Sequence, residues 1–250
     1  MIAVSFLRVM LHLLQGLLIA AVIFPWIDFA SRDRRIKKWS AALLAILHIK
    51  VELQVQAGAE SEQAALIAAN HVSWLDIFVI NSQNPCRFVA KADIRNWPAL
   101  GWLSAQGGTI FIARGKQREV RRVYEGIVTS IEAGERIAFF PEGTTAPQGG
   151  VLPFHPNLFE AAIEAKVPVQ PYAIRYVDEH GGLHHAADFI GDMTFVESML
   201  LIMKTRRMTA QLIVLSTIDT SGAHRRELAQ QTRTVIANAL GYIESAAQTD

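Results

Sequence analysis

The sequence predicts an α/β fold, in which helices flank a mixed, largely parallel sheet and an N-terminal membrane-binding helical segment precedes it. Two observations predict this. Short apolar segments alternate with helix-like patterns after about residue 46, and an apolar stretch without charges lies within the first 30 residues. The chain of 250 residues is long enough for one sizeable domain plus an appendage. We therefore expect an N-terminal membrane anchor and basic helical segment at 1–45 and an α/β domain at 46–250.

The stretch from Val9 to Ile27 contains no charged side chain. As a helix it would measure about 28 Å, which is close to the ~30 Å thickness of the hydrocarbon core. His12 and Gln15 are costly in lipid unless each faces protein or lies near an interface. The stretch can therefore be a membrane anchor, a buried or interfacial helix that lies along the membrane, or a cleaved signal peptide.

A basic cluster follows this stretch and argues against the signal peptide, whose positive charges precede its apolar region. By the positive-inside tendency, the chain after about residue 30 faces the cytoplasm. Basic residues near a membrane surface also attract anionic lipids. We therefore expect the protein at the inner (cytoplasmic) membrane, with membrane lipids as partners and the α/β domain facing the cytoplasm. The cluster comprises Arg32, Arg34, Arg35, Lys37 and Lys38, opposed by Asp33.

The α/β domain begins where the segment from Trp39 to Val55 changes from helix-like to strand-like, with apolar residues alternating from Ile49. Helices are predicted where apolar residues recur at helical spacing, between Val120 and Ile131 and between Leu228 and Ile243. Strands that alternate with helices are typical of a largely parallel sheet. The further predicted strands are 65–69, 87–90, 109–113, 136–140, 167–176 and 210–216.

Composition argues against several classes of function. The net charge of +1 gives no electrostatic footprint for nucleic acid, so we expect no nucleic-acid partner. Cys86 is the only cysteine, which rules out an internal disulfide and a cysteine cluster for zinc. The histidines of segment 180–185 lie beside two glycines without an acidic partner at ligand spacing. We interpret that segment as a surface loop and expect no metal site.

His71 directly follows the predicted strand at 65–69, and Asp76 lies five positions later. Five residues turn a regular helix by about 140°, so the two side chains can meet only if His71 lies in the strand-to-helix turn. There, the aspartate would fix the imidazole tautomer and leave the other nitrogen to accept a proton from a hydroxyl. Ser73, the nearest hydroxyl, is placed to cap the helix rather than to act as a nucleophile. On this segment alone, an unrelated turn histidine and helix carboxylate remain the alternative.

Two other predicted strands also end in charged residues. Arg114 follows the strand at 109–113, and Glu142 follows the strand at 136–140 beside a glycine. In an α/β sheet, functional groups gather at the carboxyl ends of the strands. A guanidinium suits the bidentate binding of a phosphate, and a carboxylate can orient that guanidinium or bind an acceptor hydroxyl.

These segments resemble the blocks of the glycerolipid acyltransferase family, whose best-known members are the 1-acylglycerol-3-phosphate acyltransferases. The resemblance covers about residues 39–220. A lone histidine and aspartate at this spacing is a weak signal, whereas four blocks in order at family-like spacing are a strong one. The matching residues are Asn70, His71 and Asp76; Gly108, Phe111, Ile112 and Arg114; Phe140, Pro141, Glu142, Gly143 and Thr144; and Val167, Pro168, Val169 and Pro171.

The resemblance implies transfer of a fatty acyl group from a thioester to the free hydroxyl of a lysophospholipid. Acyl-CoA or acyl carrier protein would be the co-substrate, with no bound cofactor. It implies that His71 is the general base and Asp76 its orienting partner, while Pro168 shapes the pocket. The oxyanion of the reaction needs donors, for which backbone amides near the His71 turn and Arg114 are the candidates. The residues implied to bind the headgroup or glycerol of the acceptor are Arg114, Glu142, Gly143 and Thr144.

One position departs from the family pattern. Many members that make phosphatidic acid have an arginine after Glu-Gly-Thr, where this chain has Thr145. A Glu-Gly-Thr-Thr variant occurs in acyltransferases that act on lyso-ornithine lipids. We expect 1-acyl-sn-glycerol-3-phosphate as the acceptor and phosphatidic acid as the product. The alternative acceptor is a lyso-ornithine lipid or another non-phosphatidate lysolipid, and a non-catalytic lipid-binding scaffold is a third hypothesis. Positive charge could also come from Lys91, Arg95, Lys116 or Arg118.

Overall fold

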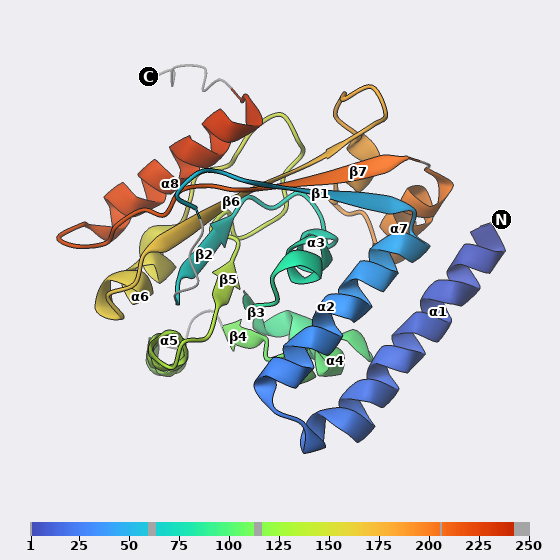
Figure 1. The fold of residues 1–250 in the computed structure, drawn as a ribbon, viewed down its shortest axis with the longest axis horizontal. Coiled ribbons are helices and arrows are strands. Elements are labelled where there is room, and N and C mark those ends of the chain that lie inside the picture. Colours follow the sequence, from blue (N-terminus) through green and yellow to red (C-terminus); the bar gives the residue numbers. More distant parts are fainter. Residues whose placement is uncertain (1, 60–63, 113–116, 206, 243–250) are drawn as a thin grey trace.

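A seven-stranded sheet forms the centre of the computed structural model, which describes residues 2–59, 64–112, 117–205 and 207–242 (Figure 1). The strand order is β1-β7-β6-β2-β5-β3-β4. The five strands from β6 to β4 are mutually parallel, whereas β7 is antiparallel to β6 and β1 is parallel to β7. The predicted mixed, largely parallel sheet is confirmed. Its strands are β1 (Ile49–Val55), β2 (Leu66–Ala69), β3 (Arg87–Lys91), β4 (Ile110–Ile112), β5 (Ile137–Phe139), β6 (Val169–Val177) and β7 (Met208–Val214).

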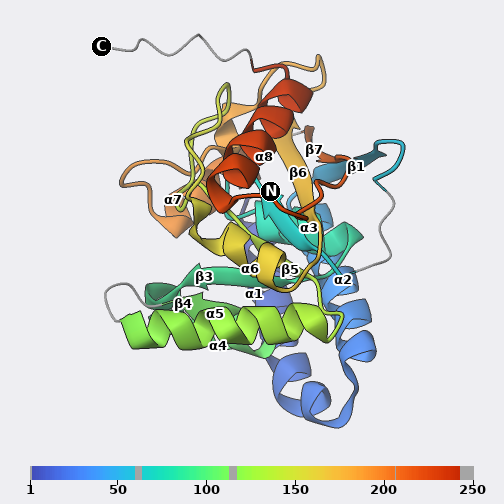
Figure 2. The same cartoon turned by 90° about the vertical axis from the view of Figure 1, so that its left-hand side faces the viewer.

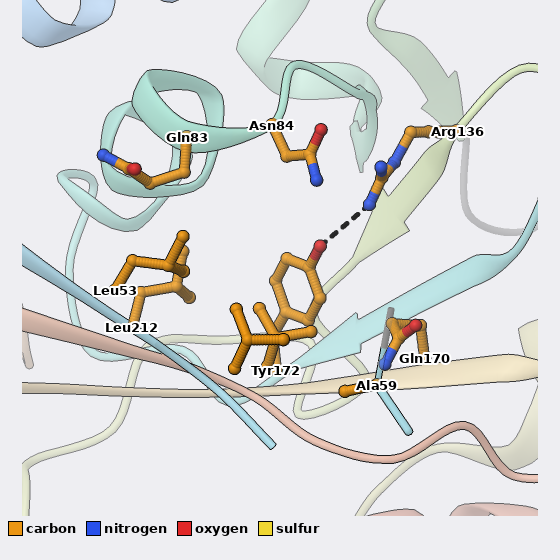
Figure 3. A pocket seen from close by; sticks show the side chains of 10 residues that line it. Leu53, Ala59, Gln83, Asn84, Arg136, Gln170, Tyr172 and Leu212 are labelled. Carbon is orange, nitrogen blue, oxygen red and sulfur yellow. Dashed lines mark hydrogen bonds between the residues drawn. The ribbon is translucent and has the colours of Figure 1, made fainter. Parts of the chain in front are cut away.

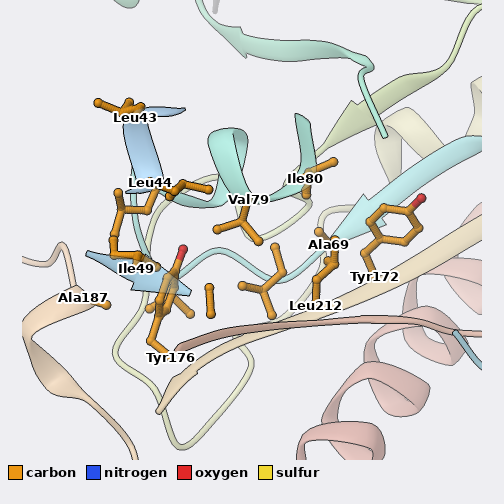
Figure 4. Close-up of a cluster of buried hydrophobic side chains, with 14 of the residues drawn as sticks. Leu43, Leu44, Ile49, Ala69, Val79, Ile80, Tyr172, Tyr176, Ala187 and Leu212 are labelled. Carbon is orange, nitrogen blue, oxygen red and sulfur yellow. The ribbon is translucent and has the colours of Figure 1, made fainter. Parts of the chain in front are cut away.

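Helices cover both faces of this sheet. One face packs against α2 (Phe29–Ile46), α3 (Asp76–Gln83) and α7 (Phe195–Lys204), as the core in Figure 4 shows in part. The other face packs against α5 (Gln117–Glu132), α6 (Phe159–Glu164) and α8 (Arg225–Leu240), which lie nearest the viewer in Figure 2. The short helix α4 (Leu100–Gln106) lies in the connection from β3 to β4.

The central strands β2 and β5 are continuous apolar runs because both faces of the sheet are buried there, whereas the edge strand β1 alternates and is largely exposed. All four residues of β2 are buried, and they alternate between the two cores. Ile67 and Ala69 belong to the core with α2 and α3, whereas Leu66 and Ala68 belong to the core with α6 and α8. The seven predicted strands and the two predicted helices α5 and α8 all form, and the strand ends differ from the prediction by two residues at most.

The N-terminal segment is a helical hairpin. Helix α1 (Ile2–Leu18) continues through a π-helical turn and a 3-10 turn to Trp26. Asp28 then caps α2 by accepting a hydrogen bond from the backbone N–H of Ser31 at 2.6 Å. The run Ile2–Trp26, with a mean hydropathy of 2.0, is the one described helix long and apolar enough to cross a membrane. It lies beside α2, which returns along it (Figure 1).

A reciprocal contact joins the two helices of the hairpin. His12 Nε2 lies 2.9 Å from the carbonyl oxygen of Trp39, and Trp39 Nε1 donates to the carbonyl of His12 at 3.1 Å. The two rings stack with centroids 4.6 Å apart. A Cβ at Gly16 would lie 2.8 Å from the Trp39 ring, so only glycine fits there. His12 therefore faces protein, which removes the cost that this polar residue would carry in lipid.

Helix α2 packs into the α/β core. Its Leu43 and Leu44 are buried in the same cluster as Val79 and Ile80 of α3 (Figure 4). The boundary at residue 45 stays a prediction, and in its packing α2 belongs with the sheet rather than with a separate anchor.

Candidate active site

The turn between β2 and α3 is fastened to the neighbouring strand β6. Asn70, directly after β2, is buried and bonds both main-chain groups of Ile174 through its side chain: Nδ2 donates to the carbonyl at 2.9 Å, and Oδ1 accepts from the N–H at 2.8 Å. The Asn70 amide thus satisfies the polar groups of β6 beyond the end of β2. It fixes the point at which the chain leaves the sheet toward His71.

His71 and Asp76 meet because His71 lies in this turn and Asp76 begins α3. His71 Nδ1 lies 2.8 Å from Asp76 Oδ2, and the Asp76 side chain is fully buried. Since a carboxylate accepts, Nδ1 carries the hydrogen and Nε2 presents its lone pair. The imidazole is 19% exposed, so a substrate can reach it. The predicted contact between His71 and Asp76 is present, so the alternative of an unrelated turn histidine and helix carboxylate does not hold.

Asp76 accepts hydrogen bonds from four groups. Its Oδ2 accepts from His71 and from the backbone N–H groups of Val72 at 2.8 Å and Ser73 at 3.0 Å, while Oδ1 accepts from the Tyr176 hydroxyl at 2.6 Å. Burial and the neighbouring Asp76 raise the pKa of Tyr176 well above its ordinary value, so this hydroxyl stays protonated and donates. Such a set of donors satisfies both oxygens of the buried carboxylate and fixes its orientation.

Ser73 differs from its predicted role as a helix cap. The residue before α3 is Leu75, and the buried Ser73 hydroxyl has no hydrogen-bond partner in the part of the chain that the structure describes. No described side chain caps α3, and the Asp76 carboxylate instead accepts the N–H groups of Val72 and Ser73 in the turn before the helix. Ser73 is fully buried and therefore cannot meet a substrate as a nucleophile.

Glu142 braces the His71 turn from the end of β5. Its Oε1 accepts the His71 backbone N–H at 2.7 Å, and its Oε2 accepts the Leu152 backbone N–H at 2.9 Å. The residue is only 5% exposed, and burial raises the pKa of Glu142 to about 6 despite these two hydrogen bonds. Both oxygens are thus engaged with backbone, and a contact of Glu142 with the acceptor stays a prediction.

The imidazole of His71 is held by the same segment. It stacks on the ring of Phe140, with centroids 3.9 Å apart and planes 9° apart. The His71 carbonyl accepts the N–H of Ala146 at 2.8 Å. The third block therefore holds the base through the Phe140 ring and the Glu142 carboxylate, and Ala146, just after the block, holds it through its amide.

The turn after Glu142 depends on its glycine. Gly143 has φ +69°, and a Cβ there would lie 3.2 Å from the His155 ring. Pro141 is buried beside it, whereas the Thr144 side chain is exposed, and its contact with the acceptor stays a prediction. The Thr145 hydroxyl donates to the carbonyl of Phe189, so this residue holds the segment after β6 against the turn.

The second block, which runs from Gly108 to Arg114, contributes fewer described residues to the site than the first and third blocks. Gly108 precedes β4, and Phe111 lies half-buried within it, under the guanidinium of Arg95 at 5.9 Å. Arg114 lies outside the described residues. Lys91 is the last residue of β3, so it lies at the carboxyl ends of the parallel strands, as His71 does, and its side chain is exposed.

Pro168 does not lie at the carboxyl ends of the strands with His71, and its role in shaping the pocket stays a prediction. It precedes β6, and its carbonyl accepts the N–H of Leu66, the first residue of β2, at 3.1 Å. Because β2 and β6 are parallel, Pro168 lies at the start of these strands and His71 lies beyond the end of β2. The block pattern does not show at which end of its strand a residue lies.

Comparisons with known proteins identify the family of the chain. The Acyltransferase family model matches residues 48–175. A 1-acyl-sn-glycerol-3-phosphate acyltransferase of Neisseria meningitidis is 32% identical over 213 residues, which is 83% of each chain. The chain belongs to the acyltransferase family. It is also 35% identical over 210 residues to a lyso-ornithine lipid O-acyltransferase of Pseudomonas aeruginosa, over 84% of this chain and 79% of that one.

A solved structure shares the fold of this acyltransferase. The crystal structure of the 1-acyl-sn-glycerophosphate acyltransferase PlsC from Thermotoga maritima matches with a TM-score of 0.65 and 19% identity, over 98% of this chain and 100% of that one. The resemblance predicted from the four blocks is confirmed, and the chain is an O-acyltransferase.

An apolar cavity of about 170 Å³ lies between the hairpin and the sheet of this acyltransferase. Phe88 of β3 lines the cavity and stacks on Phe140 with centroids 5.9 Å apart, and Phe140 in turn stacks on His71. Two rings therefore connect the cavity to the imidazole. Its wall also includes Trp39, Phe78, Cys86, Leu100 and Leu103.

A second cavity, of about 200 Å³, lies near the amino ends of the parallel strands, opposite the ends that carry His71 (Figure 3). There, Arg136 Nη2 donates to the Tyr172 hydroxyl at 2.8 Å, beside Asn84 and Gln170. Arg136 precedes β5 and Gln170 is near the start of β6, so this cavity lies away from the strand ends that carry His71 and Glu142.

Sequence reasoning missed Tyr176 and the bracing role of Glu142. Tyr176 lies in β6 on the same face as Ile174, at a position that the apolar pattern assigns to the core. The one available signal was a hydroxyl-bearing residue in a strand buried on both faces, because a buried hydroxyl requires a partner.

Proposed function

We propose that the chain transfers a fatty acyl group from acyl-CoA or acyl carrier protein to the free hydroxyl of 1-acyl-sn-glycerol-3-phosphate, giving phosphatidic acid. The observation that carries the proposal is the geometry of His71. Its Nδ1 lies 2.8 Å from a buried carboxylate, while no described residue bonds Nε2 of this partly exposed ring. An imidazole held this way is a general base for an alcohol.

In the proposed mechanism the nucleophile is the alcohol of the acceptor. Its oxygen attacks the thioester carbonyl carbon while His71 Nε2 takes the hydroxyl proton. The new C–O bond forms, the C–S bond breaks, and the imidazolium returns the proton to the departing thiolate. Asp76 stabilises the transient imidazolium, and its four hydrogen-bond donors fix the carboxylate in place.

Exposed positive charge beside the site supports an anionic headgroup. Lys91 ends β3 at the edge that carries His71, and Arg95 follows it with an exposed side chain. We propose that these residues and Arg114 attract the phosphate of the acceptor. Thr145 favours a second candidate, a lyso-ornithine lipid, because it occupies the position of the usual arginine and its hydroxyl already bonds the Phe189 carbonyl. The likeness to lyso-ornithine lipid O-acyltransferases supports the same candidate.

The apolar cavity next to Phe88 and Phe140 is the proposed site for an acyl chain. A chain in it would be shielded from water by the hairpin and α4, while its reacting end would lie on the His71 side of the two rings. Filling the cavity should therefore shorten the acyl chains that are used.

We further propose that α1 lies along the membrane. One face of α1 carries exposed apolar side chains, and the other packs on α2 through Trp39. A helix perpendicular to the bilayer would carry α2 and α7, which α1 touches, into the hydrocarbon. An interfacial position avoids this, since it immerses only the exposed face and leaves the basic start of α2 near anionic headgroups. The exposed residues of this face and of the turn after it include Val4, Leu7, Leu11, Leu14, Leu18, Val22 and Trp26.

The test is acyl transfer by the purified full-length protein in detergent. An acyl thioester is offered with lysophosphatidate and with lyso-ornithine lipid side by side, and products are identified by mass. Phosphatidate formed by the wild type and lost in folded His71→Ala supports the proposal. Preference for lyso-ornithine lipid selects the second candidate, and lipid binding without thioester consumption contradicts both.

A further inference from the structure

Segment 150–152 lies against the site and connects it to the last helix. The Leu152 N–H is the group that donates to Glu142 Oε2 at 2.9 Å, so Glu142 joins this segment to the His71 backbone. If the segment moves, Glu142 loses one of its two partners. The position of His71 therefore depends on what holds Leu152.

Arg233 holds this segment from the other side. Its Nε donates to the carbonyls of Val151 at 3.0 Å and Leu152 at 3.1 Å, and its Nη2 donates to the Val151 carbonyl at 2.8 Å. A planar guanidinium suits two adjacent carbonyls because its N–H groups are fixed in one plane. Arg233 thus clamps the peptide whose N–H group bonds Glu142.

The clamp has a rigid support. Arg233 projects from α8, whose Leu228, Ile236 and Leu240 are buried in the core on that face of the sheet. Val151 belongs to the same core. A continuous chain of hydrogen bonds therefore leads from a packed helix through one peptide and one carboxylate to the backbone of His71.

We propose that Arg233 is a positioning residue for acyl transfer. It does not touch the imidazole; it acts through the 151–152 peptide and Glu142, and its effect is to hold His71 at the distance and angle that proton transfer requires. None of the four sequence blocks contains it. This inference rests on the proposed role of His71 as the base.

The test compares Arg233→Ala and Arg233→Lys with Arg226→Ala, an exposed arginine on the same helix, in the assay described above. A displacement of about 1 Å can cost roughly 10²-fold in rate. We therefore expect kcat of Arg233→Ala to be about 10²-fold lower than that of the wild type, with little change in the KM for the acyl thioester or for the lysolipid acceptor. Lysine has no planar fork and should restore only part of the loss. Added guanidinium at non-denaturing concentration should raise kcat of Arg233→Ala and leave Arg226→Ala unchanged.

The outcomes separate this proposal from the proposed function. Wild-type kcat in folded Arg233→Ala overturns it, and so does a loss of kcat that follows the loss of folded protein and does not respond to guanidinium. If Arg233→Ala does not fold, Arg233→Lys decides, and a kcat equal to that of the wild type overturns the proposal. Failure of the wild type and of Arg226→Ala to transfer acyl groups would instead contradict the proposed function.

Discussion

Replacing Asp76 with asparagine tests whether the negative charge beside the base is needed. Asparagine is nearly isosteric, and its amide oxygen can still accept from His71 Nδ1 and from the N–H groups of Val72 and Ser73. The Tyr176 hydroxyl can turn to accept from the new amide nitrogen, because a phenol both donates and accepts. Asp76→Asn should therefore fold, while the imidazolium formed in the transition state loses its ionic partner.

The magnitude follows from the separation of the charges. Nδ1 and Oδ2 are 2.8 Å apart, which places the charge centres of the two groups at about 4 Å. At an effective dielectric constant of about 20, two unit charges at that separation attract by about 4 kcal/mol. At 1.36 kcal/mol for each factor of ten, loss of that attraction should lower kcat by about 10³-fold.

The assay is kcat for phosphatidate formation, read by mass, with circular dichroism to verify the fold. Asp93→Asn, which changes an exposed carboxylate, is the matched control. A folded Asp76→Asn with kcat within about tenfold of the wild type would refute the reasoning, since tenfold corresponds to only about 1.4 kcal/mol. The role of Asp76 would then be limited to holding the ring.

Three further predictions concern stability, each measured by denaturant unfolding. Tyr176→Phe removes a buried donor to Asp76 and should cost about 1.5–3 kcal/mol, and an unchanged midpoint would contradict this. Burial raises the pKa of Glu142 from 4.5 to about 6, so the carboxyl contributes its full stabilisation below pH 4.5 and loses it as pH rises through 6. Over that window the free energy of unfolding of the wild type should fall by about 2 kcal/mol relative to that of Glu142→Gln. A difference in free energy of unfolding between the two proteins that does not change with pH would contradict the raised pKa of Glu142. Gly143→Ala should cost about 1–2 kcal/mol because of its φ of +69°, while Gly150→Ala, the control without positive φ, should be neutral.

The centre of the sheet was predictable because β2 and β5 are buried on both faces. Leu66–Ala69 reads as a plain apolar run since its residues alternate between two cores, and a run of four such residues followed by a polar turn marks a strand end. The pairing of His71 with Asp76 was predictable for a related reason, since the strand end forces His71 into the turn. Local pattern and chain geometry were sufficient for both.

Partners distant in sequence were not predictable. Tyr176 bonds Asp76 and Ile174 bonds Asn70 because β6 lies next to β2, and strand order is not written in the sequence. The partners of Glu142 are backbone N–H groups, which every residue except proline has and which therefore leave no signature. In the hairpin, the absence of charges did not reveal that one face of α1 packs on Trp39.

The two carboxylates of the site also restrict where the reaction's oxyanion can be stabilised. The backbone N–H of His71 bonds Glu142, and those of Val72 and Ser73 bond Asp76, so three successive amides of the turn are already engaged. Amides near His71 were one of the two predicted sources of oxyanion donors, and these three have negatively charged partners that a substrate oxygen would have to displace. A buried hydrogen bond to a carboxylate is stronger than one between neutral groups, so displacement is unfavourable. The N–H groups of residues 71–73 therefore do not donate to the oxyanion. The hydrogen-bond donors to the oxyanion must come from outside this turn.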